Sequence, residues 1–193
     1  MLEAQKKPVH LYLEANPNPN SLKFVVNFML ADDGVSFDFP DEQHAENSPL
    51  AKALFNFAAV ERVFIAANFV TVTKKTDVTW ESIQDHIRDQ IKSYLETGKP
   101  AVNTQFEADP LFDENDSETV KKIKGILDEY IRPAVEQDGG AIVFHSFQEG
   151  VVKVLLQGAC SGCPSSTVTL KAGIENLLKG MLPEVKSVEA EGI

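Results

Sequence analysis

The sequence predicts a mixed α/β protein of the α+β class, built as two small domains that each pack a small sheet against two helices. Two observations support this prediction. Both halves of the chain alternate strand-like runs with apolar stripes at helical spacing, and an acidic segment containing two prolines separates the halves. The length of 193 residues suits one large domain or two small ones, and 43% hydrophobic with 24% charged residues is an ordinary globular composition.

The first half of the chain alternates strands and helices. Apolar alternation and β-branched runs predict strands at residues 9–15, 22–30, 35–39, 63–66 and 69–73. Asp33-Gly34 predicts a hairpin between the second and third of these strands. Ser48-Pro49 and Thr79 are typical helix starts. The helix that begins at Thr79 carries an apolar stripe, which consists of Trp80, Ile83, Ile87, Ile91 and Leu95.

The second half opens with a helix whose apolar stripe consists of Val120, Ile123, Leu127, Tyr130 and Ile131. Pro133 is expected to kink this helix or to lie at its end, because proline lacks the backbone N–H. Asp138-Gly139-Gly140 predicts the C-terminal cap of the helix, where glycine accepts a positive φ. The remaining elements are a hairpin of residues 142–148 and 151–156, a helix from Ser165 or Ser166 to Pro183, and a strand at 185–190.

The domain boundaries are expected near residues 97 and 117. Residues 1–97 would form the first domain, 98–117 an acidic linker and 118–193 the second domain. The linker contains three apolar residues that are unusual in such a segment, namely Phe106, Leu111 and Phe112. They favour a short loop that is pinned to a surface.

The charge of the chain limits its partners. Eighteen Lys and Arg against 29 Asp and Glu give a formal net charge of −11. An acidic protein repels phosphate groups, so we expect neither nucleic acid nor a membrane surface among its partners. No run approaches the roughly 18 apolar residues of a membrane span. The first ten residues, MLEAQKKPVH, resemble neither a signal peptide nor a transit peptide, so the expected location is cytoplasmic.

Cys160 and Cys163 are the only cysteines, and they lie between a predicted strand and a predicted helix start. A helix N-terminus offers N–H groups and partial positive charge, which stabilise thiolates and the anionic sulfurs of a cluster. Gly158 and Gly162 let the backbone turn freely beside the pair. Both thiols are therefore expected to be exposed and available for chemistry.

Several kinds of site compete for this C-x-x-C. The cysteines could be structural, or they could form the redox pair of a dithiol–disulfide oxidoreductase, although that arrangement needs a larger βαβ framework. A zinc site needs four ligands. None of the four histidines is spaced to complete such a site locally; they are His10, His44, His86 and His145.

An iron–sulfur cluster also prefers four thiolates, of which one chain supplies two. A second copy of the chain is the simplest source of the other two, with a two-fold axis through the metal site. This interpretation predicts a metal-bridged homodimer. A cluster held by one short loop per chain is accessible, which suits a carrier better than an electron-transfer centre.

Several longer motifs resemble those of a known family. In the second half they are Arg132-Pro133, Asp138-Gly139-Gly140, residues 158–166, Thr169-Leu170-Lys171 and Gly173-Ile174-Glu175. In the first half they are residues 17–24, 48–55, 63–65 and 68–74 together with Trp80. These motifs resemble the N-terminal domain of Nfu proteins and the C-terminal domain of NifU-type proteins. The resemblance covers nearly the whole chain except the linker.

The resemblance implies a non-enzymatic iron–sulfur cluster scaffold or carrier. Cys160 and Cys163 match the family's ligands for a [4Fe-4S] cluster, which bridges two subunits and passes to apo-proteins. The family's N-terminal domain lacks ligands and is associated with partner recognition. The cysteine-rich assembly domains of nitrogen-fixation NifU proteins have no counterpart in this sequence. The resemblance thus favours receiving a cluster from upstream assembly proteins and delivering it.

Two further motifs allow a structural and a functional interpretation. Asp138-Gly139-Gly140 is expected to serve as a helix cap, with a direct role near the cluster as the alternative. The hydroxyl groups of Ser161, Ser165 and Ser166 could donate hydrogen bonds to cluster sulfurs. The simpler interpretation makes Ser165 or Ser166 the N-cap of the following helix.

Overall fold

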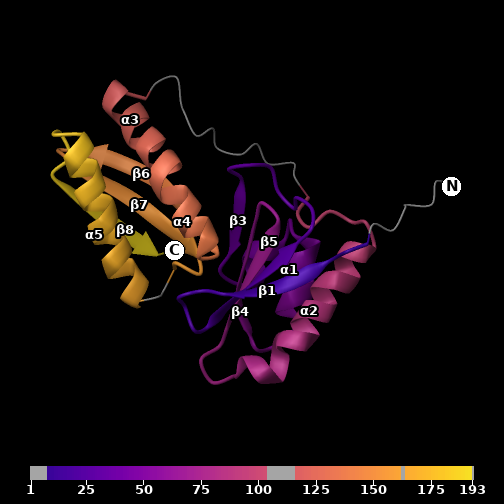
Figure 1. The fold of residues 1–193 in the computed structure, drawn as a ribbon. Coiled ribbons are helices and arrows are strands. Elements are labelled where there is room, and N and C mark those ends of the chain that lie inside the picture. The colour runs from indigo at the N-terminus through magenta and orange to yellow at the C-terminus, as the bar shows by residue number, and fades with distance from the viewer. Residues whose placement is uncertain (1–7, 104–115, 162–163, 193) are drawn as a thin grey trace. The chain divides into compact units, whose positions relative to one another are not determined.

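The computed structural model describes residues 8–103, 116–161 and 164–192, without the side chains of 164–167. The chain divides into two compact units, Met1–Phe106 and Glu107–Ile193, and each is described by itself (Figure 1). The linker residues Phe106, Leu111 and Phe112 lie outside the described residues. The boundaries expected at residues 97 and 117 stay a prediction.

The first unit contains, among its described residues, a five-stranded antiparallel sheet with helices on one face. Its strands are β1 (Leu11–Ala15), β2 (Ser21–Val26), β3 (Ser36–Phe39), β4 (Val60–Ala66) and β5 (Phe69–Lys74). Its helices are η1 (Glu42–Ala45), α1 (Pro49–Phe55) and α2 (Trp80–Glu96). The strands follow the spatial order β1-β2-β5-β4-β3. The strands and helices expected in this half are therefore all present.

The hairpin predicted at Asp33-Gly34 is wrong. β2 pairs with β1 and β5, whereas β3 pairs with β4 at the opposite edge of the sheet. The turn exists, with Gly34 at φ 76°, but it belongs to a longer connection that crosses the end of the sheet. There the Leu30 amide donates to the carbonyl of Ala67 at 2.6 Å. A local turn motif sets the direction of the chain but cannot specify which distant strand becomes the neighbour.

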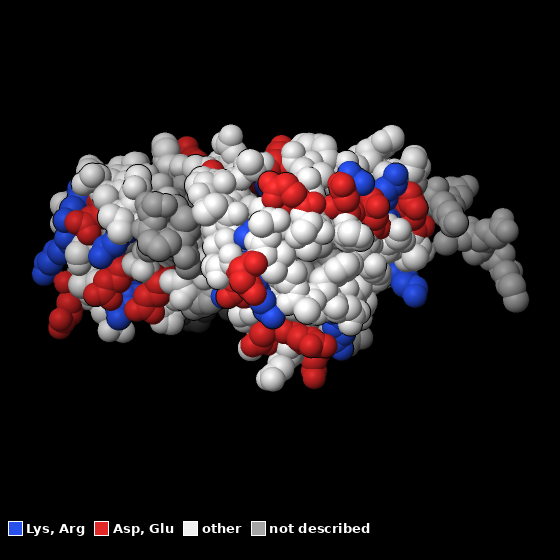
Figure 2. Space-filling model, turned by 90° about the horizontal axis from the view of Figure 1, so that it is seen from below, with Lys and Arg blue, Asp and Glu red and all other residues white. Residues whose placement is uncertain are grey.

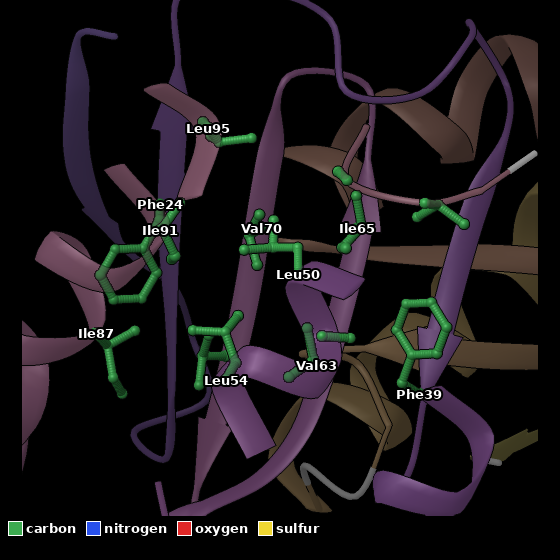
Figure 3. Packing of buried hydrophobic residues seen from close by; sticks show 14 of the residues in the cluster. Phe24, Phe39, Leu50, Leu54, Val63, Ile65, Val70, Ile87, Ile91 and Leu95 are labelled. Carbon is green, nitrogen blue, oxygen red and sulfur yellow. The ribbon is translucent and has the colours of Figure 1, made fainter. Parts of the chain in front are cut away.

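The core of the first unit lies between one face of the sheet and the two longer helices (Figure 3). The helix stripe of the sequence is confirmed, since Ile87, Ile91 and Leu95 are buried against the sheet. Leu50 and Leu54 of α1 are fully buried in the same layer. Each such burial stabilises the unit by about 1.5–3 kcal/mol relative to an exposed side chain.

The Asn-Pro turn between β1 and β2 is held by hydrogen bonds to distant residues. The Lys74 ammonium donates to the Asn20 side-chain oxygen at 3.0 Å, and the Trp80 indole donates to the carbonyl of Pro19 at 3.2 Å. The amide of Asn20 donates to the Asn18 side chain at 3.0 Å. This turn is therefore fixed to β5 and to the start of α2.

The chain after α2 folds back onto the first unit. Ala101 and Val102 are buried in its core, and the amide of Asn103 donates to the carbonyl of Asn47 at 2.8 Å. The buried Ser48 hydroxyl makes two bonds here: it accepts from the amide of Ala51 at 3.0 Å and donates to the carbonyl of Ala101 at 2.7 Å. Ser48 thus caps α1, as the sequence predicts, and also anchors the returning segment.

The second unit contains, within its described residues, a three-stranded sheet of order β6-β7-β8. Its elements are α3 (Glu118–Ile126), η2 (Leu127–Ile131), α4 (Arg132–Gln137), β6 (Gly140–Gln148), β7 (Val151–Gly158), α5 (Pro164–Met181) and β8 (Ser187–Gly192). β6 and β7 form the predicted hairpin, and α5 connects β7 to the parallel strand β8. The predicted α+β class with two small domains is confirmed.

Pro133 lies in the first turn of α4, directly after the π-helical turn η2. Proline has no backbone N–H and cannot donate the usual helical hydrogen bond. A π-helical turn is wider than an α-helical turn, and it lets the helix continue past Pro133. The amide of Arg132 donates to the carbonyl of Leu127 across the wide turn, and the Arg132 guanidinium pairs with Asp128. The sequence predicts a kink or an end at Pro133, and the structure has a π-helical turn there.

The surface carries side chains of both charges. On the face shown in Figure 2, acidic and basic side chains lie interspersed among the residues described. No helix in the described ranges is both long and apolar enough to cross a membrane.

Replacing Ser48 with alanine is expected to destabilise the first unit by about 2 kcal/mol, because it removes the cap of α1 and leaves the buried Ala101 carbonyl without its donor. Urea unfolding followed by the fluorescence of Trp80, the single tryptophan, measures this loss. Ser82→Ala removes an exposed hydroxyl that donates to the carbonyl of Thr79 and should change stability by less than about 0.5 kcal/mol. Equal midpoints for the two variants would contradict the double role of Ser48.

Candidate functional site

The candidate site is the loop that joins β7 to α5. β7 ends at Gly158, whose φ of 63° lies in the left-handed region that favours glycine. The amide of Ser161 donates to the carbonyl of Gly158 at 3.1 Å, which closes a tight turn around Cys160. α5 begins at Pro164, close to the helix start expected at Ser165 or Ser166. Cys163 lies outside the described residues, as do the side chains of Ser165 and Ser166.

Cys160 is buried, with only 5% of its surface exposed. Its side chain packs against Val135 of α4 and Leu156 of β7, and Ile131 and Leu170 lie around this small cluster. The expectation that the thiol of Cys160 is exposed is therefore wrong. A glycine-rich loop before a helix does not by itself expose its cysteines. Here α4, which precedes the sheet, covers Cys160 with the side chain of Val135.

The turn at Gly139-Gly140 packs directly against the cysteine loop. Gly139 has a φ of 80° and its amide donates to the carbonyl of Glu136 at 3.0 Å, which confirms the predicted helix cap. The Gly139 carbonyl accepts from the amide of Ala159 at 3.2 Å. A Cβ atom on Gly140 would lie 2.9 Å from the Cys160 sulfur. The sequence thus predicts the cap at Gly139, and the structure adds the close approach of Gly140 to the Cys160 sulfur.

A β-bulge sets which residues meet at this end of the hairpin. Near the hairpin turn Ser146 pairs with Lys153, but beyond His145 the register shifts by one residue, so that Phe144 pairs with Val154. The shift continues to the end of the ladder, where Gly140 faces Gly158. The glycine turn and the cysteine loop thus meet backbone to backbone.

The histidines are exposed and dispersed. His10, His86 and His145 are surface residues, and the Nδ1 atom of His44 lies 2.7 Å from the Asp41 carboxylate. The hydrogen bond from His44 lowers the pKa of Asp41. Within the described ranges, no group of three or more His, Cys, Asp or Glu side chains is placed to hold a metal ion.

Glu175 fixes α5 to the edge strand. Its carboxylate accepts a hydrogen bond from the amide of Val188, in β8, at 3.0 Å and pairs with Lys179 one turn along the helix. The hydrogen bond from Lys179 and the bond from the Val188 amide hold the pKa of Glu175 below its ordinary value. Glu175 therefore ties the helix that follows the cysteine loop to the sheet.

Comparison with known proteins gives two family matches. Residues 11–98 match the family described as "Scaffold protein Nfu/NifU N terminal", and residues 123–189 match the "NifU-like domain". A relative from Arabidopsis thaliana, "NifU-like protein 5, mitochondrial", is 45% identical over 97% of this chain and 70% of its own length. The chain belongs to the Nfu/NifU scaffold family. The resemblance noted from the sequence motifs is therefore confirmed.

A second curated relative agrees with this assignment. The "NFU1 iron-sulfur cluster scaffold homolog, mitochondrial" of Drosophila sechellia is 43% identical over 96% of this chain, which spans 66% of that relative's length. A solution NMR structure of a NifU-like protein from Saccharomyces cerevisiae is 28% identical and covers 54% of this chain and 92% of its own, with a TM-score of 0.47. The Nfu/NifU scaffold family is non-catalytic, so the expectation that the chain is not an enzyme is confirmed.

The expected cytoplasmic location is wrong. Relatives that are 43–45% identical over nearly the whole chain are named mitochondrial. The expectation rested on the composition of the first ten residues. This Nfu/NifU chain spans only part of the length of these relatives.

Replacing Glu175 with glutamine is expected to lower the stability of the second unit at neutral pH, where the carboxylate is ionised. Because the pKa of Glu175 is lowered in the folded protein, its contribution is complete above the ordinary value of 4.5 and disappears as the pH falls through the lowered pKa. Calorimetric melting temperatures measured at stepped pH should therefore converge for the wild-type and Glu175→Gln proteins in acid. Glu184→Gln removes an exposed carboxylate of the same unit and is the control. A gap between wild type and Glu175→Gln that persists unchanged into acid would refute the ion-pair account.

Proposed function

We propose that this chain is an iron–sulfur cluster carrier. It binds a [4Fe-4S] cluster through Cys160 and Cys163, shares the cluster with a second copy of itself, and passes it to apo-proteins. Membership of the Nfu/NifU scaffold family supports this proposal, as do relatives whose names describe an iron–sulfur cluster scaffold. The observation that carries it is the pair of cysteines in the loop between β7 and α5, in a chain with no other thiols.

The chemistry of the loop suits thiolate ligation of iron. The first helical turn of α5 follows the loop, and its N–H groups and partial positive charge stabilise anionic sulfur. Gly158 allows the backbone to turn sharply just before Cys160. The Val135 and Leu156 side chains exclude water from one side of Cys160, which strengthens electrostatic interactions there.

The number of ligands makes the carrier a dimer. A [4Fe-4S] cluster takes four thiolates, and one chain supplies two. A two-fold axis through the cluster completes the set from two identical loops. The cluster is cargo rather than a permanent part of the protein, because each chain holds it by a single short loop.

Transfer follows from ligand exchange. Thiolates of an apo-protein replace those of the carrier one at a time, and an upstream assembly protein supplies the cluster to the carrier in the same way. The first unit contributes recognition of these partners. Apo iron–sulfur proteins are therefore the proposed recipients.

Replacing either Cys160 or Cys163 with serine should abolish cluster binding after anaerobic reconstitution. The wild-type protein should hold about four irons per dimer. Iron and sulfide analysis measures this result. Met181→Ser, which introduces a serine at an exposed position on the far end of α5, is the control and should keep the wild-type iron content.

Two results would overturn the proposal. One is a wild-type protein that stays free of iron and sulfide after reconstitution. The other is an iron-free protein whose two cysteines instead form a reversible internal disulfide and reduce a test disulfide at a useful rate. The second result would indicate a dithiol–disulfide oxidoreductase.

A further inference from the structure

We propose that Gly140 is a positioning residue for Cys160: the absence of a side chain at Gly140 leaves the space in which the Cys160 thiol lies. This inference rests on the proposed function, in which Cys160 is a cluster ligand. Gly140 lies 20 residues before Cys160 in the chain and belongs to a motif that the helix cap at Gly139 does not fully explain.

The contact distances carry the proposal. A Cβ atom on Gly140 would lie 2.5 Å from the carbonyl oxygen of Gln157, 2.9 Å from the Cys160 sulfur and 3.2 Å from the Cys160 Cβ atom. Real Cβ atoms essentially never approach other heavy atoms within 3.0 Å. The sulfur and the neighbouring backbone must therefore shift if any side chain is added at this position.

Space, rather than backbone conformation, requires glycine at this position. Gly139 and Gly158 adopt positive φ values of 80° and 63°, which only glycine tolerates easily. Gly140 is not among the residues with positive φ. Alanine could adopt its backbone conformation, so the contacts with Cys160 and Gln157 are what exclude it.

The surroundings of Cys160 leave few directions in which its sulfur can move. Val135 and Leu156 pack against it, and the hydrogen bond from the Ala159 amide to the Gly139 carbonyl holds the loop against the turn. Core side chains are close-packed, so an added methyl group cannot be absorbed by a small adjustment. Alanine at position 140 is therefore expected to push the Cys160 side chain out of its pocket.

The test compares three glycine-to-alanine variants of the full chain. Gly140→Ala adds a methyl group beside Cys160. Gly150→Ala strains the hairpin turn at the opposite end of β6 and β7, where φ is 90°, and so lowers stability without touching Cys160. Gly125→Ala adds a methyl group on α3, where nothing lies within 4 Å. Gly150→Ala thus controls for a general loss of stability, and Gly125→Ala controls for the glycine-to-alanine change alone. An effect seen only in Gly140→Ala reports displacement of Cys160.

The first readout needs no cluster. In a Cys163→Ser background, the remaining thiol is Cys160, and its rate of alkylation reports its exposure. Gly140→Ala should raise that rate severalfold, whereas Gly150→Ala and Gly125→Ala should leave it close to the parent rate. The proposal is overturned if Gly140→Ala is alkylated at the same rate as the parent. It is also overturned if Gly150→Ala raises the alkylation rate as much as Gly140→Ala does.

The second readout connects the pocket to the proposed function. With both cysteines present, Gly140→Ala should lose most of the reconstituted iron and sulfide, while both controls keep it. If no variant, including the wild type, binds a cluster, the proposed function fails, but the alkylation result still tests the position of Cys160. Full iron content in Gly140→Ala would overturn the proposal.

A double-mutant cycle covers the case in which Gly140→Ala does not fold. Removing the sulfur with Cys160→Ala takes away one of the two closest contacts. Gly140→Ala should then cost less stability in the Cys160→Ala background than in the parent. The measurement is a smaller drop in melting temperature, or recovered folding where Gly140→Ala alone does not fold. The same loss of stability in both backgrounds would show that the sulfur plays no part in the requirement for glycine.

Discussion

The second unit depends on one close contact, in which the backbone of the Gly139-Gly140 turn lies against the loop that carries Cys160. The end of α4, the first residue of β6 and the last residue of β7 all meet there. A hydrogen bond from Ala159 to Gly139 holds the two segments together, and no side chain separates Gly140 from the sulfur. The position of the candidate ligand is thus set by elements distant in sequence from the C-x-x-C.

Much of this architecture can be predicted from local sequence. The period-2 runs give the strands, and the apolar stripe at Ile87, Ile91 and Leu95 gives the buried face of α2, because both patterns reflect burial on one side of a regular element. Ser48 can be identified as a helix cap because capping is also local: its hydroxyl accepts from an amide only three residues away. The C-x-x-C and the motifs around it suffice to predict the family.

Features that depend on distant contacts were missed. The Asp33-Gly34 turn suggested a hairpin, yet β3 pairs with β4 at the far edge of the sheet. The burial of Cys160 depends on packing with α4, and its contact with Gly140 depends on the β-bulge near His145. Without that bulge, counting outward from the hairpin turn would place Gly140 opposite Ala159 instead of Gly158. A one-residue shift of register therefore decides what lies beside the sulfur.

In the proposed carrier, two thiols per chain require two chains per cluster, because one copy supplies only half of the four sulfur ligands. Sedimentation velocity followed at the visible absorption of the reconstituted cluster measures how many chains share one cluster. The absorbance should sediment at the mass of a dimer, near twice the 21.2 kDa of the chain, and should vanish from that position when a chelator removes the iron. Cluster absorbance that sediments with a single chain would contradict this prediction.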